Sequence, residues 1–142
     1  MRVYIPVTFV GLRRAADSGN LPSSGWHAHP LLEEPDTDAD EAEYLALRAA
    51  AGESLDALRS EPEAPRRRAV VVANVPEEWT ENEPDGTVIL TRRVPVERFV
   101  AVYADTAAVT ADVVAALNGK DSPIDSVDLL WFARQELAAL VS

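Results

Sequence analysis

An uninterrupted apolar run near the middle of the chain gives the clearest structural signal. Three arginines, Arg66–Arg68, precede Ala69–Ala73, and three of those five residues are valines. β-Branched side chains suit a pleated surface. Because no polar residue interrupts the run, neither face of this segment is expected to meet water. The pattern predicts an interior strand covered on both sides, within the longer segment Ala64–Pro76.

The first thirty residues alternate between strand and helix patterns. Arg2–Pro6 predicts a strand, with Val3 and Ile5 on one face and Tyr4 on the other. Thr8 can cap a helix of about ten residues that ends at Gly19. Trp26–His29 predicts a second strand, so we expect a β-α-β unit with parallel strands and a right-handed crossover.

A long helix is predicted between the acidic connection and the central run. Asp38 followed by Glu41 resembles a capping pair, and the helix should continue to about Ser60. Apolar residues recur at spacings of three and four, which predicts one buried stripe. These residues are Tyr44, Leu47, Ala51, Leu55 and Leu58.

The second half of the chain predicts two more strands and a helix. Thr87–Val94 and Arg98–Ala104 both alternate, and the short connection between them favours an antiparallel pair. A helix should begin at Asp105 or Thr106 and end at Asn118 and Gly119.

The last segment has two interpretations. One is a strand over Leu129–Phe132 followed by a helix from about Arg134 to Val141, and the other is one continuous helix from Val127. We favour the strand followed by a helix. The whole pattern predicts an α/β or α+β single domain over residues 1–142, with a mixed sheet of about five to six strands covered by about four helices.

Composition narrows the classes of function. The net charge is −11, and acids concentrate in Leu31–Glu43 and Glu77–Asp85 without an opposing base. Such a charge repels phosphate backbones, so we expect no nucleic-acid partner. The chain has no cysteine, and the first ten residues are too short an apolar run for a membrane span or signal peptide. We expect a cytoplasmic protein with no membrane partner.

His27 and His29 form the most chemically suggestive motif. In a strand they point to the same side, which is one way to hold Zn²⁺. Glu33, Glu34 and Asp36 are near enough in sequence to supply an oxygen ligand. The alternative is two partly exposed histidines beside a loop. Two ligands do not make a site, so the sequence predicts no metal and no cofactor.

Two other ligand-binding candidates lie at the ends of the central strand. Arg66, Arg67 and Arg68 can bind an anion, together with Arg92, Arg93 and Arg98, or pair with acids of the same protein. Asn74 would lie near Pro6–Thr8 and His27–His29 if these strands were parallel, since ligands bind at the carboxyl ends of parallel strands. Capping of the following turn is the alternative role for Asn74.

Known catalytic signatures are missing from the sequence. There is no glycine-rich phosphate loop, no G-x-S-x-G, no H-E-x-x-H and no dinucleotide-binding fingerprint. Asp36, Asp38 and Asp40 have the spacing that opens an EF-hand loop. Glu41 and Leu47, however, occupy the positions of the required glycine and bidentate glutamate. No catalytic residue is predicted.

Three segments together resemble a family of small, uncharacterised actinobacterial proteins, a domain of unknown function. They are M-R-V-Y-I-P, A-P-R-R-R-A-V-V-V-A-N-V-P and D-L-L-W-F-A-R-Q-E-L. The family pattern has tyrosine at Phe132 and proline at Arg134. A proline there suits the first turn of a helix and supports the division of the terminal segment. The resemblance implies one domain and transfers no catalytic residue.

Two hypotheses for function follow from the sequence. The first is a non-enzymatic cytoplasmic protein that binds another macromolecule or itself, with a protein partner or a homo-oligomer as the result. It rests on the missing catalytic signatures and the concentrated acidic segments. The alternative is an enzyme or a protein that binds a small ligand or metal near His27, His29 and Asn74.

Overall fold

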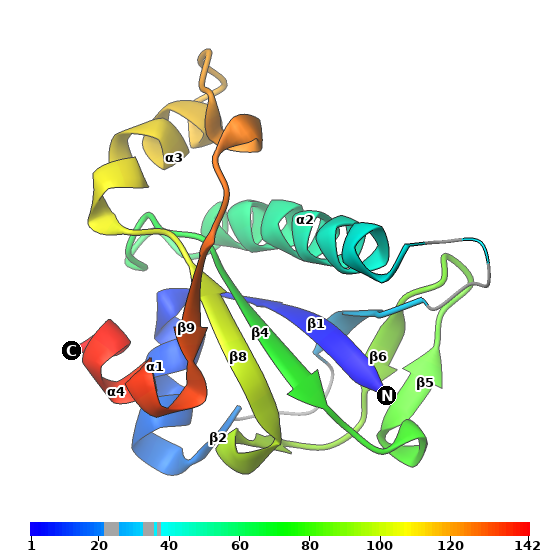
Figure 1. Cartoon of the computed structure of the whole chain (residues 1–142). Helices are drawn as coiled ribbons and strands as arrows, with labels where there is room; N and C mark the ends of the chain where they lie inside the picture. Colours follow the sequence, from blue (N-terminus) through cyan, green and yellow to red (C-terminus); the bar gives the residue numbers. More distant parts are fainter. Residues whose placement is uncertain (22–25, 33–35, 37) are drawn as a thin grey trace.

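The computed structural model describes the whole chain except residues 22–25, 33–35 and 37. Its main feature is a seven-stranded sheet in which every pair of neighbours is antiparallel, in the order β5-β6-β3-β1-β4-β8-β9 (Figure 1). The strands are β1 (Arg2–Val7), β3 (His27–Pro30), β4 (Ala69–Asn74), β5 (Thr80–Asn82), β6 (Val88–Leu90), β8 (Phe99–Ala104) and β9 (Leu130–Ala133). A separate two-stranded sheet joins β2 (Asn20–Leu21) to β7 (Val94–Pro95).

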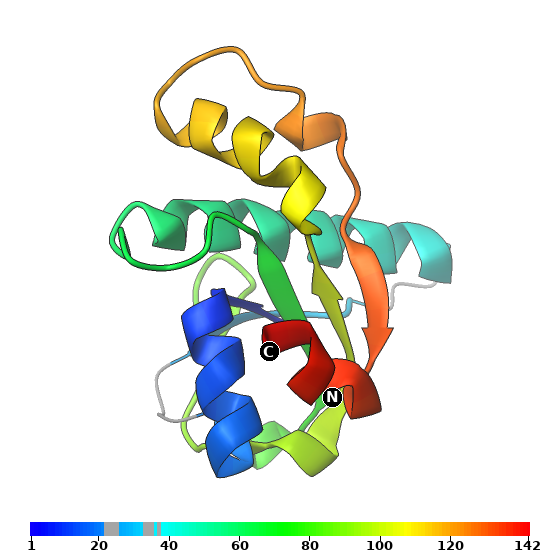
Figure 2. The ribbon, with the colours of Figure 1, turned by 90° about the vertical axis from the view of Figure 1, so that its left-hand side faces the viewer.

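Helices cover both faces of the main sheet. They are α1 (Phe9–Ser18), α2 (Ala39–Leu58), α3 (Thr110–Leu117) and α4 (Leu137–Val141). α1 and α4 lie on one face, α2 lies on the other, and α3 packs beyond α2 (Figures 1 and 2). Short 3₁₀ turns complete the chain, at Glu77–Trp79, Val96–Arg98, Ala107–Val109, Ile124–Ser126 and Arg134–Glu136. None of the helices in the described residues is both long and apolar enough to cross a membrane.

The central strand is confirmed as an interior one. β4 lies between β1 and β8, and its residues Ala69–Ala73 are buried. Val71 faces the core beneath α1 and α4, whereas Val70 and Val72 face the core beneath α2. The side chains of β1 divide in the expected way, because Val3 and Ile5 belong to the first of these cores.

The predicted parallel β-α-β unit is wrong. α1 leads into β2, which belongs to the small sheet, and β3 then returns antiparallel to β1. Alternation of apolar and polar residues shows which face a side chain occupies, but it is the same for both strand directions. The described strands therefore form an antiparallel sheet of seven strands, where a mixed sheet of five to six was expected.

Two further expectations about strands need correction. The segment Thr87–Val94 contains two strands, since exposed residues 91–93 separate β6 from β7, and these belong to different sheets. The predicted pairing of this segment with Arg98–Ala104 is also wrong, because β8 pairs with β4 and β9. The terminal segment is a strand followed by a helix, as favoured from the sequence.

The predicted stripe of α2 is correct in part, because Ala51 and Leu58 are buried and Leu47 and Leu55 are partly buried against the core. Tyr44 is 49% exposed, and alanines and Ser54 face the sheet instead. Small side chains let the helix approach the sheet closely. The buried Ser54 hydroxyl donates to the Val7 carbonyl at 2.6 Å and accepts from the Ala69 amide at 2.9 Å, which joins α2 to β1 and β4.

Candidate metal centre

Two histidines and one glutamate converge between the sheet and α2. His27 and His29 alternate on β3 and so point to the same side, with ring centroids 5.4 Å apart. Glu53 projects from α2, with Oε2 lying 2.8 Å from His27 Nδ1 and Oε1 lying 3.0 Å from His29 Nε2. Ligand atoms from the three side chains lie within 4.8 Å of one another.

A chain of hydrogen bonds assigns the protons of His27. Hydrogen bonds from the Thr87 hydroxyl and amide hold the pKa of Asp85 below its usual value, so this carboxyl is ionised near neutral pH. The Thr87 hydroxyl donates its single proton to Asp85 Oδ1. Thr87 Oγ1 can then only accept from His27 Nε2, which lies 2.5 Å away. His27 therefore carries a proton on Nε2.

With its proton on Nε2, a neutral His27 has no proton on Nδ1, the ring nitrogen that faces Glu53. In neutral imidazole only one nitrogen is protonated, so His27 Nδ1 presents a lone pair to the Glu53 carboxylate oxygen Oε2 at 2.8 Å. His29 Nε2 is buried and makes no hydrogen bond within the described residues, although Glu53 Oε1 is close. A cation shared among these atoms, either an additional proton or a metal ion, removes the repulsion between the Nδ1 lone pair of His27 and the Glu53 carboxylate.

The ligand set suits a divalent transition metal. Imidazole nitrogen and carboxylate oxygen are zinc ligands at about 2.0–2.2 Å, which places tetrahedral ligand atoms about 3.3 Å apart. The two Glu53 oxygens lie 2.8 and 3.0 Å from the two ring nitrogens, so each of these nitrogen–oxygen pairs needs to separate by at most about half an ångström. Asp85 and Thr87 orient His27 from outside the ligand set, as carboxylates and hydroxyls commonly do at metal centres.

A cavity adjoins the cluster. Its volume is about 310 Å³, and His29, Asp85 and Thr87 line it beside small and aliphatic side chains of α2. Three protein ligands leave a fourth coordination position for water or an exogenous group, and this cavity provides space for one.

The sequence identified only part of this cluster. Of the acids expected to join the histidines, Asp36 is exposed and outside the cluster, and Glu33 and Glu34 lie outside the described residues. Glu53 was missed because it is 26 residues from His27 in sequence. The sequence feature that could have identified Glu53 is its position three residues after the buried Ala50, which places this acid near the sheet-facing side of α2.

Asn74 lies apart from the histidines. It is exposed at the end of β4, opposite Arg2 in the ladder, whereas residues 6–8 lie at the other end of β1. The antiparallel strands therefore do not bring Asn74, Pro6–Thr8 and the histidines to one edge, as the parallel arrangement required.

The arginine triplet contacts groups of the same protein. Arg66 Nη1 donates to the carbonyls of Leu58 and Glu61, and Arg67 Nε donates to the Asp105 carbonyl. Arg68 is buried and forms a bidentate ion pair with Asp105, in which Nε and Nη2 each lie 2.9 Å from a carboxylate oxygen. The described contacts of all three arginines are therefore structural.

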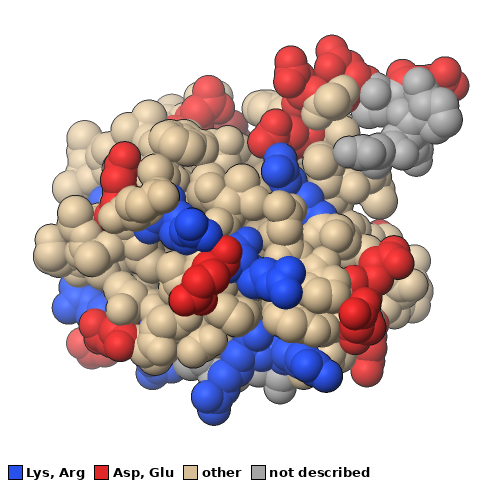
Figure 3. Space-filling model, turned by 60° about the horizontal axis from the view of Figure 1, so that its bottom comes forward, with Lys and Arg blue, Asp and Glu red and all other residues tan. Residues whose placement is uncertain are grey.

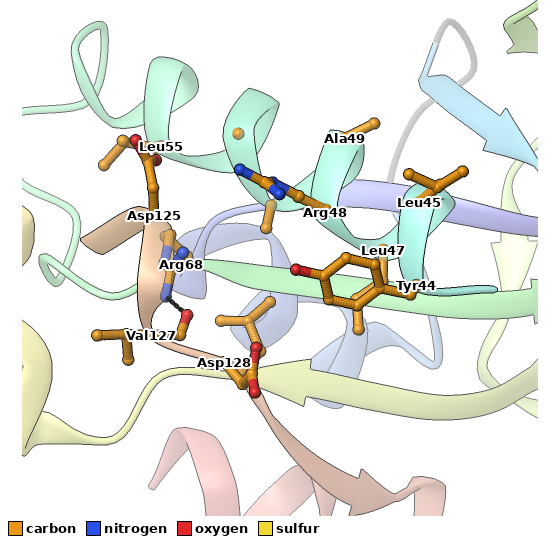
Figure 4. Close-up of a pocket in the computed structure, with 13 residues that line it drawn as sticks. Tyr44, Leu45, Leu47, Arg48, Ala49, Leu55, Arg68, Asp125, Val127 and Asp128 are labelled. Carbon is orange, nitrogen blue, oxygen red and sulfur yellow. Dashed lines mark hydrogen bonds between the residues drawn. The ribbon is translucent and has the colours of Figure 1, made fainter. Parts of the chain in front are cut away.

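Arg68 also borders a second hollow, of about 670 Å³, between α2 and the segment leading to β9 (Figure 4). Its Nη2 donates to the Val127 carbonyl at 2.9 Å, which holds this segment in place. Tyr44, Arg48 and Asp128 line the opening. The wall is mixed in charge, and none of its described residues has a buried polar atom without a hydrogen bond, as His29 has.

A separate group of arginines lies at the other end of β4. The guanidinium carbons of Arg92 and Arg98 lie 5.7 and 5.1 Å from the centroid of the Trp79 ring. Arg98 immediately precedes β8, whose first residue pairs with Ala73, so the full strand separates it from Arg66–Arg68. Figure 3 shows basic side chains gathered on one face, with most acidic side chains towards its rim. The two arginine groups do not form one patch.

Comparison with known proteins gives one match. No curated protein and no solved structure is found to match the chain. The model of a family of unknown function (DUF6912) matches residues 1–141, which is almost the entire chain. The protein therefore belongs to this family of unknown function, DUF6912.

Proposed function

We propose that this protein binds a divalent transition metal, with zinc as the best fit, through His27, His29 and Glu53. The observation that supports this most strongly is the Nδ1 lone pair of His27 facing the Glu53 carboxylate, with His29 Nε2 buried beside the same carboxylate and lacking a hydrogen bond within the described residues. The adjoining cavity is consistent with an open coordination position. Asp85 and Thr87 act as positioning residues for His27.

Metal binding should be visible in both stoichiometry and stability. The experiment is equilibrium dialysis of untagged protein against Zn²⁺ at pH 7.5, followed by metal analysis and thermal unfolding. We expect one bound zinc per chain. At a free concentration 100 times the Kd, zinc should stabilise the fold by about 2.7 kcal/mol, which raises Tm by about 9 °C for 142 residues.

Variants of the proposed ligands distinguish a specific zinc site from adventitious zinc binding. His29→Ala and Glu53→Gln should each weaken zinc binding at least about 100-fold, and Thr87→Val by about 10- to 100-fold. Glu41→Gln, the same change at an exposed position of α2, is the matched control and should bind zinc normally. Zinc that binds equally to wild type and Glu53→Gln, or that leaves Tm unchanged, would contradict the proposal.

The second candidate is a non-enzymatic role in binding another macromolecule or in self-association. The observation that favours it is the exposure of Trp131, 58%, on an outer strand of the sheet. Large aromatic side chains are enriched at the centres of protein interfaces. Affinity capture from the native host with wild type and Trp131→Glu tests this role, because a specific partner should depend on this side chain.

We also propose a cellular location and an origin for the protein, which apply to both candidate functions. The absence of cysteine fits a reducing cytoplasm, and the net charge of −11 disfavours nucleic acid as a partner. The family resemblance and the near-exclusive use of arginine over lysine support an actinobacterial origin. Fractionation of the native host, with detection of the untagged protein, tests the location.

A further inference from the structure

The outer strand β9 is an open edge of the main sheet. Within the described residues it pairs with β8 on one side and is the last strand on the other (Figure 2). Its four residues, Leu130–Ala133, carry no charge. An edge strand presents unpaired backbone N–H and C=O groups, which are a template for pairing with another strand.

The two edges of the sheet differ in their protection. At the opposite edge, β5 is three residues long and carries Glu81, and further acids flank it. Short, charged edge strands resist pairing with other chains. β9 lacks such charges and exposes Leu130 by 51% and Trp131 by 58%.

The sheet surface beside Trp131 is also incompletely covered. α2 packs mainly on β1, β3 and β4. Trp131 lies opposite Tyr103 in the β8–β9 ladder, and this tyrosine is only partly buried. An aromatic surface therefore continues from the edge of the sheet onto its α2 face, where a strand added at β9 would extend it.

We infer that β9 pairs antiparallel with β9 of a second copy, around a two-fold axis at Trp131. Asp128 lies two residues before β9 and Arg134 is the first residue after it. In this register Asp128 of each copy comes opposite Arg134 of the other, so a pair of opposite charges flanks each end of the ladder. Moving the axis to Leu130 places Asp128 opposite Phe132, and moving it to Phe132 places Asp128 opposite Glu136. Charge complementarity thus selects the register centred on Trp131.

The same register provides contacts between side chains. The two Trp131 side chains become a directly opposed cross-strand pair, with Cβ atoms about 4.5–5.5 Å apart, a distance at which aromatic rings interact. Arg134 uses Nη1 to bind the Glu97 carbonyl at 2.7 Å and retains other donors for the partner's carboxylate. Asp128 is exposed and makes no ion pair within the described residues.

This inference rests on the second candidate function and is independent of metal binding. Sedimentation equilibrium of the untagged full chain from about 1 to 500 µM, a range suited to a small interface, tests it. We expect a reversible monomer–dimer equilibrium, with Trp131→Glu raising the dissociation constant at least about 30-fold. Asp128→Lys and Arg134→Glu should each raise it at least about tenfold, since like charges then face each other.

The double variant Asp128→Lys with Arg134→Glu makes the register testable. It exchanges the two charges, so dimerisation should return to within about threefold of wild type. Asp125→Lys, the same change at a nearby exposed residue, is the control and should not alter the dissociation constant. Circular dichroism of each variant verifies that it is folded.

Two outcomes would overturn the inference in different ways. A chain that is monomeric throughout the range would contradict both the pairing and self-association. A dimer whose dissociation constant is unchanged by Asp128→Lys, by Arg134→Glu and by the double variant would contradict the proposed register at β9. Self-association itself would still stand as a function.

Discussion

Breaking the buried ion pair between Arg68 and Asp105 should be one of the most destabilising single changes outside the apolar core. Arg68 is 6% exposed and Asp105 is 1% exposed. Asp105 accepts from Nε and Nη2 of Arg68 and from its backbone amide, each at 2.9 Å. The same guanidinium donates to the Val127 carbonyl, so this pair also holds the segment leading to β9.

Asp105→Asn keeps the size of the side chain and removes its charge. Breaking a buried pair leaves one charge uncompensated, which costs about 3–5 kcal/mol. For a chain of 142 residues this lowers Tm by about 10–17 °C. Urea unfolding and thermal unfolding of the variant measure the loss directly, because an unfolding free energy of 5–15 kcal/mol is typical of single domains.

The chain offers a matched control for this change. Asp56 pairs with Arg59 at 3.6 Å, but both side chains are largely exposed. Asp56→Asn should alter stability by less than about 1 kcal/mol, since solvent screens exposed pairs. If Asp105→Asn lowered the unfolding free energy no more than Asp56→Asn, burial would not make the Arg68–Asp105 pair more costly to break than an exposed pair.

Other changes test individual features of the fold. The Tyr4 hydroxyl is buried without a hydrogen bond in the described residues, so Tyr4→Phe should stabilise the fold by about 1 kcal/mol. Burial and the nearby Glu43 raise the pKa of Tyr4 above its unfolded value of about 10, so wild-type stability should fall as pH rises above about 10. The unfolding free energy of Tyr4→Phe, measured in urea, should fall less steeply with rising pH than that of the wild type. Identical slopes of free energy against pH would contradict a role for Tyr4 ionisation. Gly52→Ala, in α2 with open space around the new methyl group, should stabilise by about 1 kcal/mol, whereas Gly19→Ala, at φ 81°, should destabilise by a similar amount. If both variants shifted Tm in the same direction, the opposite roles proposed for Gly52 and Gly19 would be wrong.

Local patterns predicted the elements of this fold better than their arrangement. The valines of β4 and the alternation of β1 specify buried strands whatever their neighbours are. The direction of β3 depends on the path after α1, which passes through the two residues of β2 before the chain returns. So short a strand has too few residues for an alternation pattern, and the parallel interpretation followed from its omission.

The candidate site illustrates the same limit. Side-chain periodicity placed His27 and His29 on one side of a strand, and the structure brings both to Glu53. Glu53 comes from a helix whose buried face includes Ala42, Ala46, Ala50 and Ser54, and the predicted stripe of mainly larger apolar residues left this part of the face out. Contacts between distant segments require the orientation of that helix, and no spacing within the sequence supplies it.

Nuclear magnetic resonance of the histidine rings tests the proposed metal centre most directly. The chain has only two histidines, so long-range ¹H–¹⁵N spectra resolve every ring nitrogen with little ambiguity. We expect Zn²⁺ to shift His27 Nδ1 and His29 Nε2 to metal-bound values at one equivalent, while His27 Nε2 keeps its proton and still donates it to Thr87 Oγ1. Ring nitrogens that remain unchanged at saturating Zn²⁺ would contradict the metal centre.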